Sequence, residues 1–383
     1  MTILFLCRED NLVREIRGYA RAFRRRGVHV NCVPPGFPLD GDLRPLLDRC
    51  PQSPSLIFHP DSDFMLLPWG LTRVEIPTLY LQADAYAFMH VRLRLSMLFD
   101  WVLLLHEGFE ERFREVGHPG PIALPQAVDA ECFQKPKSER GIEVASVGQV
   151  AGPIYQTRKQ VLSQLSSRFR MNEWWRRHSF EELAAVYQES RVVINIARDD
   201  YPQDANLRAF EAMAAGALLI TRVPSELQAI GFEEGTHFAG YRAPAEIGEV
   251  IRKFLADEPA RRRIAEAGRE KTLAGHTYDC RVKTLLERLE EEGSRLCAPA
   301  RQWPEERVRL LYLEYFTGDP SLGTAYREFW RIARRSVRHA IAGAPLLARA
   351  WARKARNRMR AGIASGARGK LPAGLGAGAP SGR

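Results

Sequence analysis

The chain has 383 residues, more than one hydrophobic core usually holds, so its length predicts two domains with additions. Hydrophobic residues make up 45% of it and charged residues 27%, which excludes a wholly disordered or collagen-like protein. The net charge of +10 is concentrated at one end, because residues 331–383 contain thirteen Lys and Arg and neither Asp nor Glu. Residues 1–330 hold the other 43 basic and all 46 acidic residues. We therefore expect a nearly neutral globular body with a strongly basic C-terminal segment.

The cysteines and the N-terminus indicate a cytoplasmic protein. The six cysteines are scattered, without a CxxC pair or a metal-ligand spacing, which favours reduced thiols. The apolar run Ile3–Cys7 is too short for the core of a signal peptide, and Arg8, Glu9 and Asp10 follow it at once. No stretch approaches the roughly 18 apolar residues of a membrane-spanning helix.

Residues 1–130 alternate apolar runs of strand length with helical patterns. The expected strands are Thr2–Cys7, Val28–Val33, Leu56–His59, Thr78–Gln82, Trp101–His106 and Ile122–Pro125. Strand and helix in repetition predict a parallel sheet with helices on both faces, and such a sheet binds its ligands beyond the carboxyl ends of its strands.

The same alternation begins again after a Pro-containing polar linker at 131–140. Residues 141–297 predict strands at Ile142–Val147, Arg168–Met171, Arg191–Ala197, Ala217–Val223 and His237–Tyr241, with helices at about 155–167, 179–190 and 205–215. The fold class that follows is α/β, with two Rossmann-like, doubly wound domains facing a central cleft. The strand ends of both domains would line that cleft.

A helical, basic extension is expected at 298–361. Its first helix begins at Pro304, and a second runs over about 323–342 with an apolar stripe. Pro345 is expected to interrupt that helix, and the stripe resumes beyond it at steps of four. Residues 362–383 are rich in Gly, Ala, Pro and Arg, and we expect them to be disordered.

Several common catalytic motifs are missing. The first strand is followed by Arg8-Glu9-Asp10-Asn11, without the glycines of a dinucleotide-binding turn. The chain also has no GxxxxGK, HExxH or GxSxG motif. These absences argue against a dehydrogenase, a P-loop NTPase, a zinc protease and a hydrolase with a nucleophile elbow.

One segment is suited to bind a phosphate. Gly148 follows the predicted strand 142–147, and Arg158 and Lys159 lie in the helix that comes next. A glycine at this place lets an anion approach backbone amides, and nearby cations would balance its charge. An ordinary turn is the alternative interpretation of Gly148.

A second segment carries a carboxylate in an unusual place. Residues 199–221 form a polar loop, a helix of small residues, Gly216 and another apolar strand, and Glu211 lies within that nearly apolar helix. An unpaired buried carboxylate is costly. Either a cation such as Arg208 satisfies Glu211, or Glu211 faces the cleft and accepts hydrogen bonds from hydroxyl groups of a ligand.

The second half of the chain resembles a known family. The residues that carry the resemblance are Asn206-x-Arg208-x-Phe210-Glu211-Ala212-Met213-Ala214-Ala215-Gly216, Tyr187-x-x-Ser190-Arg191-Val192-Val193-Ile194-Asn195 and His276-Thr277-Tyr278-x-x-Arg281. They are similar to GT-B glycosyltransferases, in particular the spore-maturation (CgeB-like) type near glycosyltransferase family 4 (group 1). The similarity covers about 142–290, and the first domain agrees with the family in layout.

The resemblance implies transfer of a sugar from a nucleotide-diphosphate donor to an acceptor hydroxyl, with retention of configuration. It implies that Glu211 binds the ribose and that the loop of Gly148 lies near the diphosphate. Many relatives have a second glutamate eight positions earlier, where this chain has Gln203, and the neighbouring Asp204 is a candidate substitute. The donor site that we predict consists of Gly148, Arg158, Lys159, Asn206, Arg208 and Glu211.

The chemistry needs cations and a group on the acceptor side. Negative charge develops on the departing diphosphate, and oriented donors that stabilise such charge are each worth about 3–4 kcal/mol. Arg158, Lys159 and Arg208 are candidates for this, and we therefore expect no metal and no cofactor besides the donor. Asp84 and His106 follow first-domain strands and are candidate catalytic bases if the reaction inverts. Asp61-Ser62-Asp63 resembles the DxD motif of metal-dependent glycosyltransferases, but the two-domain layout differs from that class.

Two other functions fit the same architecture: a non-catalytic protein that binds a nucleotide or sugar, for which Gln203 is the main support, and a nucleotide-sugar epimerase. Expected partners are a nucleotide sugar and a glycan, lipid-linked or protein acceptor. The basic segment could be a solvated surface, a helix that docks on the body, a nucleic-acid contact or a membrane contact. Its apolar stripe favours an anionic membrane surface, bound through residues 325–361 at the inner face of the membrane, over a nucleic acid.

Overall fold

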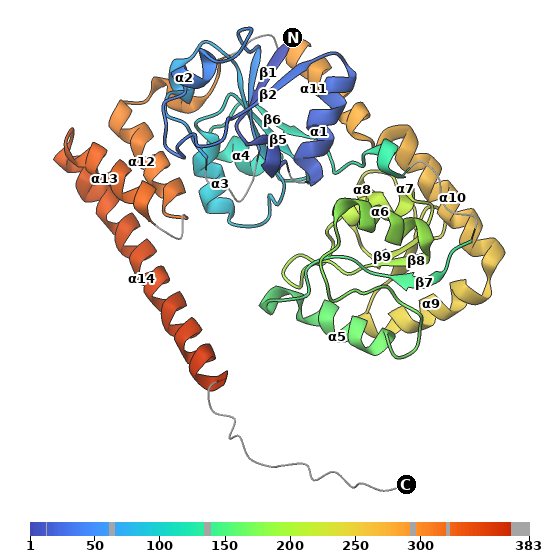
Figure 1. Ribbon diagram of the computed structural model, residues 1–383. Coiled ribbons are helices and arrows are strands. Elements are labelled where there is room, and N and C mark those ends of the chain that lie inside the picture. Colours follow the sequence, from blue (N-terminus) through green and yellow to red (C-terminus); the bar gives the residue numbers. More distant parts are fainter. Residues whose placement is uncertain (13, 61–65, 134–138, 292–295, 319–321, 369–383) are drawn as a thin grey trace, which may run out of the picture. The chain divides into compact units, whose positions relative to one another are not determined.

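A computed structural model describes residues 1–12, 14–60, 66–133, 139–291, 296–318 and 322–368 (Figure 1). The chain forms two compact units, Met1–Gln302 and Trp303–Arg383. The first unit contains two parallel sheets, and the second is helical. The alternation of strands and helices that the sequence predicts in both halves is confirmed.

The first sheet has six parallel strands in the order β2-β1-β3-β4-β5-β6. The strands are β1 Thr2–Phe5, β2 His29–Cys32, β3 Leu56–His59, β4 Thr78–Gln82, β5 Trp101–Leu104 and β6 Pro121–Ala123. The helices between them are α1 Arg14–Arg25, α2 Arg44–Leu47, α3 Met89–Ser96 and α4 Glu110–Glu115, with short 3-10 turns at Glu9–Asn11 and Leu71–Arg73. Each of the six predicted apolar runs contains or overlaps one strand.

Buried aromatic side chains fix α1 on this sheet. Phe5 of β1 stacks on Phe58 of β3 with ring centroids 4.6 Å apart, and Phe23 of α1 meets both rings edge-on. All three side chains are fully buried. Because burying a Phe side chain contributes about 1.5–3 kcal/mol, this cluster holds the first helix against β1 and β3, in the middle of the sheet.

The second sheet has four parallel strands in the order β10-β9-β8-β7. The strands are β7 Ile142–Ala145, β8 Ser190–Asn195, β9 Leu218–Arg222 and β10 Ala239–Tyr241. The helices are α5 Gln156–Leu165, α6 Phe180–Glu189, α7 Leu207–Ala214, α8 Glu226–Ala229, α9 Ile247–Ala256, α10 Glu258–Gly275 and α11 Tyr278–Glu291, with 3-10 turns at Ala130–Phe133, Pro153–Tyr155, Pro244–Glu246 and Pro299–Gln302. The small residues of α7 are buried against the sheet, as their size allows.

One predicted strand of this sheet is wrong. Arg168–Met171 makes only an isolated bridge to Val144, and Glu143 and Val144 donate hydrogen bonds to the carbonyl of Arg170. The segment lies in the connection from α5 to α6, where Asn172 takes over the pairing through its side chain: it accepts from the Ser146 amide and donates to the Ser146 carbonyl. A side chain replaces the backbone ladder there, so the strand does not extend.

The end of the first unit returns to the first sheet. Helix α11 packs against α1, where a Cβ on Gly18 would come within 2.1 Å of the Tyr278 ring, so only glycine fits. Farther along, Arg301 forms an ion pair with the buried Asp100 at 2.7 Å. Both contacts anchor residues that follow the second sheet in the chain to the helices and loops of the first sheet.

The second unit consists of α12 Glu305–Phe316, α13 Gly323–Ala333 and α14 Val337–Arg368, which pack on one another. The helix expected at 323–342 is two helices, because the Ser336 hydroxyl accepts a hydrogen bond from the amide of His339 and begins α14. Pro345 does not interrupt α14, since a proline removes a single backbone donor and the surrounding alanines favour helix. For the same reason the helix continues through 362–368, which we had expected to be disordered.

Candidate functional site

The candidate site lies where the carboxyl ends of both sheets meet. His106 follows β5 and Asp84 follows β4 in the first sheet, whereas Asp204 follows β8 and Glu226 follows β9 in the second. Side chains from the two sheets contact each other directly, through His106 with Glu226 and Asp84 with Arg198. The structure thus brings together the first-domain and second-domain residues that the sequence places at strand ends.

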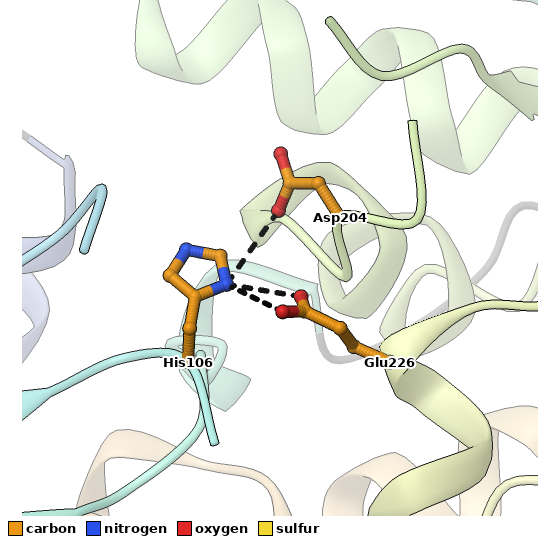
Figure 2. A group of neighbouring side chains, drawn as sticks. All are labelled: His106, Asp204 and Glu226. Atoms are coloured by element: carbon orange, nitrogen blue, oxygen red, sulfur yellow. Dashed lines mark hydrogen bonds and ion pairs between the residues drawn. The ribbon is translucent and has the colours of Figure 1, made fainter. Parts of the chain in front are cut away.

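The buried His106 pairs with Glu226, whose side chain is 18% exposed (Figure 2). Nδ1 of His106 lies 2.9 Å from Oε2 and 3.1 Å from Oε1 of Glu226. The carboxylate also accepts hydrogen bonds from the Tyr201 hydroxyl at 2.6 Å and the Ala205 amide at 2.9 Å. A carboxylate only accepts, so Nδ1 carries the proton that bonds Glu226, and Nε2 is not used in this pair.

Glu226 was not predicted from the sequence. It is the first residue of α8, behind the N-cap Ser225, a few residues after β9 ends. A carboxylate beyond the carboxyl end of a predicted strand was the available signal, but the sequence does not show that this strand end faces β5. Hydrogen bonds from His106 and Tyr201 outweigh the effect of burial and lower the pKa of Glu226.

Asp204 is buried beside this pair without a donor for one of its oxygens. Its Oδ1 lies 4.0 Å from Nδ1 of His106 and has no hydrogen-bond partner among the described residues. Burial raises the pKa of Asp204 to about 6. For His106, burial acts against the charged form, but Glu226 and the negative charge of Asp204 outweigh it and raise the pKa of the imidazole.

His106, Asp204 and Glu226 are close enough to hold a metal ion, with ligand atoms within 4.8 Å of one another. Glu226, however, already accepts hydrogen bonds from three donors, so its position is explained without a cation. Asp61-Ser62-Asp63, the DxD-like sequence, lies outside the described residues.

Two stacked tyrosines form a wall beside the pair. Tyr86 of the first sheet's loops stacks on Tyr201 of the second, with centroids 4.0 Å apart and an interplanar angle of 13°. The guanidinium of Arg198 lies 5.2 Å from the centre of the Tyr86 ring and 3.6 Å from the carboxylate of Asp84. Asp84 is about half exposed and accepts a hydrogen bond from the Tyr86 hydroxyl, so it lies at the rim of the site.

Arg158 and Arg208 converge on Gly148. A Cβ at Gly148, whose φ is +139°, would lie 3.2 Å from a terminal nitrogen of each guanidinium. Arg158 donates to the carbonyls of Ile196 at 2.7 Å and Gln149 at 2.5 Å, while its buried Nη2 has no partner in the described part of the chain. Burial and the charge of Arg208 lower the pKa of Arg158 to about 9. Two neighbouring guanidinium groups beside a glycine, which has no side chain to block its backbone, make a place suited to an anion.

The other predicted site residues, Asn206, Lys159 and Gln203, lie in the segments that follow β7 and β8. Asn206 precedes α7, and its Oδ1 is buried without a partner among the residues described. Lys159 is exposed and borders a surface groove of about 710 Å³ next to the Gly148 loop. The backbone carbonyl of Gln203 accepts a hydrogen bond from the Glu226 amide at 3.0 Å, so Gln203 supports the start of α8.

Glu211 is satisfied by a cation, as one of the two interpretations expected, but not by Arg208. Arg14 of α1 reaches across from the first sheet and bonds both carboxylate oxygens, while Arg208 donates to Asn195. Burial raises the pKa of Glu211, and Arg14 opposes this effect. The cavity beside the pair has a volume of about 10 Å³, room for no more than one water molecule. The role of Glu211 in ribose binding stays a prediction.

Comparison with known proteins agrees with this geometry. A family model described as "Glycosyl transferase-like" matches residues 134–287, which include the second sheet and the Gly148 and Asn206 segments. Within this match, residues 139–287 form a glycosyl transferase-like domain. Among curated proteins, none is significantly similar to the chain in sequence.

Solved structures share the fold of this chain over 76% of its length. A sucrose-phosphate synthase from Thermosynechococcus elongatus has a TM-score of 0.54 at 15% identity, with all of that chain covered. HepE from Anabaena, in complex with UDP and glucose, has a TM-score of 0.53 at 12% identity, again with its whole chain covered. A glycosyltransferase from Rickettsia africae has a TM-score of 0.50 at 9% identity, with 98% of that chain covered. The predicted two-domain GT-B fold is confirmed.

Proposed function

We propose that the protein transfers a sugar from a nucleoside-diphosphate sugar to an acceptor hydroxyl. The observation that carries this proposal is a set of buried polar atoms without partners at the carboxyl ends of the second sheet. Among the described residues these are Nη2 of Arg158, Oδ1 of Asn206 and Oδ1 of Asp204. Donors and acceptors left unpaired in a buried place cost free energy, which a polar ligand would recover.

The two arginines would hold the diphosphate. Cleavage of the bond between the anomeric carbon and the diphosphate oxygen leaves the electron pair on that oxygen. Arg158 and Arg208, beside Gly148, would stabilise this charge, and one preorganised donor of this kind is worth about 3–4 kcal/mol. The guanidinium groups supply positive charge at this point, so we propose a reaction that does not depend on a metal.

His106 would bind the sugar or its acceptor. Its Nδ1 is held by Glu226, which would leave Nε2 for a ligand hydroxyl. The resemblance to family 4 favours a retaining reaction, in which the acceptor's proton passes to the departing phosphate. In an inverting reaction Nε2 of His106 would take that proton. Asp84 is about half exposed and paired with Arg198. We therefore propose that it contacts the acceptor at the rim of the site, in preference to acting as the base.

Calorimetry with nucleotides tests the donor site. HepE was solved with UDP, so UDP, UDP-glucose and uridine are the first probes, followed by the other nucleoside diphosphates. We expect binding of one nucleoside diphosphate and much weaker binding of its nucleoside. Binding of none of them would refute the proposal.

Product analysis separates the three functions that fit the fold. A glycosyltransferase releases the nucleoside diphosphate when an acceptor is added, an epimerase converts one nucleotide sugar into another without release, and a binding protein does neither.

The acceptor that we propose is a glycan, a lipid-linked sugar or a protein hydroxyl. The location that we propose is cytoplasmic, with peripheral attachment to the membrane through the basic extension.

A further inference from the structure

Helix α14 has two apolar faces, and one of them is buried inside the extension. Gly343, Leu347 and Ala350 are buried at steps of four and three. Gly343 is so close to α12 that a Cβ on it would lie 2.8 Å from Leu313. This face accounts for the packing of α14 on α12 and α13, so the second apolar face is not needed for that packing.

The second face is exposed along the described length of α14. Val337, Ile341, Trp351 and Met359 lie on it, and their exposed fractions run from 56% to 72%. Ala344, Ala348 and Ala355 fill the positions between them, so the stripe continues at steps of three and four. We call these seven residues the outer stripe.

Helix α13 extends the outer stripe sideways. Tyr326 and Trp330, one helical turn apart, are exposed at 39% and 59%. The indole nitrogen of Trp351 contacts the hydroxyl of Tyr326, so the aromatic side chains of the two helices lie side by side. Large exposed aromatic and aliphatic groups gathered in this way mark a surface that contacts another phase or molecule.

Arginines flank the outer stripe along one side. Arg338, Arg349 and Arg356 are exposed and lie roughly 90–120° around the helix from the centre of the stripe, and the exposed Arg353 lies farther round. Residues 331–383 contain no acidic residue, so no carboxylate within this segment neutralises them. An apolar face bordered by unopposed arginines matches the interface of an anionic bilayer, where apolar groups enter the acyl boundary and cations contact the head groups.

We propose that the outer stripe, with Tyr326 and Trp330, is a membrane-docking surface that binds an anionic lipid bilayer. No described helix is long and apolar enough to cross a membrane, so this contact is peripheral. Stable attachment of a protein to a membrane takes more than one signal, and this surface combines several cations with aromatic groups. The support for this surface is the geometry of the extension alone. That the surface brings the enzyme close to a lipid-linked acceptor depends, in addition, on the proposed function.

Co-sedimentation of the full chain with vesicles tests this surface. Wild type is expected to pellet with vesicles of phosphatidylglycerol and phosphatidylcholine at low salt, and not with phosphatidylcholine alone. Replacing Ile341, Trp330 and Trp351 by Ser is expected to weaken binding at least tenfold. Replacing Arg338, Arg349 and Arg356 by Gln is expected to weaken it about a hundredfold, because each cation contributes roughly a fivefold effect.

Trp175→Ser is the matched control. Trp175 is 61% exposed but lies in the first unit, so its loss should leave vesicle binding unchanged. Calorimetry with the nucleoside diphosphate on the same variants separates this proposal from the transferase function, because donor affinity should stay that of wild type. The proposal is overturned if wild type ignores anionic vesicles, if the Ser variant binds them as wild type does, or if the chain binds RNA and not vesicles.

Discussion

Asp204→Asn is expected to stabilise the protein at neutral and higher pH. Burial raises the pKa of Asp204 from 3.8 to about 6, so the folded protein favours the neutral acid. The stability that this group contributes is complete below 3.8 and is lost as the pH rises through about 6. Above that range the buried carboxylate, with Oδ1 unpartnered in the described structure, destabilises the fold. An amide of the same shape carries no charge and escapes this cost.

The shift of about two pKa units corresponds to about 3 kcal/mol at pH 8. By the same linkage the advantage of the variant falls to about 1.5 kcal/mol at pH 5 and about 0.5 kcal/mol at pH 4. Thermal unfolding of wild type and variant at the three values of pH measures it, and the advantage at pH 8 should raise Tm by roughly 5 °C or more. A variant no more stable than wild type at pH 8, or an advantage that does not shrink toward pH 4, would refute the reasoning.

Asp100→Asn is the matched comparison. Asp100 is equally buried but accepts hydrogen bonds from Thr78 and Ala298 and is paired with Arg301. Removing its charge leaves Arg301 without its carboxylate, so this variant should lose about 3–5 kcal/mol. Opposite signs for the two substitutions would show that hydrogen bonding, and not burial alone, decides what a buried carboxylate costs. A costly carboxylate retained at the candidate site is consistent with the proposed role of Asp204 in binding or catalysis.

Three further substitutions test the site. Glu226→Gln should remove the negative charge that stabilises protonated His106, so the pKa of His106 should fall. The ionisation of His106 in the pH–rate profile should then move to lower pH. An unchanged profile would mean that the pair does not act in the reaction. Arg158→Ala should weaken binding of the nucleoside diphosphate at least tenfold in calorimetry and leave binding of the nucleoside nearly unchanged, and equal losses would place Arg158 away from the phosphates. Glu211→Gln should weaken nucleotide binding if Glu211 holds the ribose, whereas Arg14→Met should not; equal donor affinity of Glu211→Gln and wild type would leave Glu211 with only a structural role.

Local patterns in the sequence were sufficient for most elements of the two sheets. Runs such as Leu56–His59 and Thr78–Gln82 form strands with the predicted bounds, because a parallel strand buried on both faces is apolar along its whole length. The small residues around Phe210 predict the helix that lies close on the sheet. Where a side chain competes with the backbone, the pattern misleads: Asn172 pairs with Ser146 where a strand at Arg168–Met171 was expected.

The candidate site depends on contacts that no local pattern encodes. Arg14 and Glu211 are separated by 197 positions, and His106 and Glu226 by 120. Each residue taken alone is an ordinary polar residue, and only the meeting of the two sheets gives it a partner from the other sheet.

The extension shows the same division between sequence and structure. Its sequence contains enough apolar positions for a stripe, and from them the sequence predicts the amphipathic helices. Leu347 and Trp351 both satisfy that pattern at a spacing of four, yet Leu347 is buried and Trp351 is 56% exposed. The packing of α14 on α12 and α13 decides which side faces inward, because a helix with two apolar faces can bury only the one that its neighbours cover.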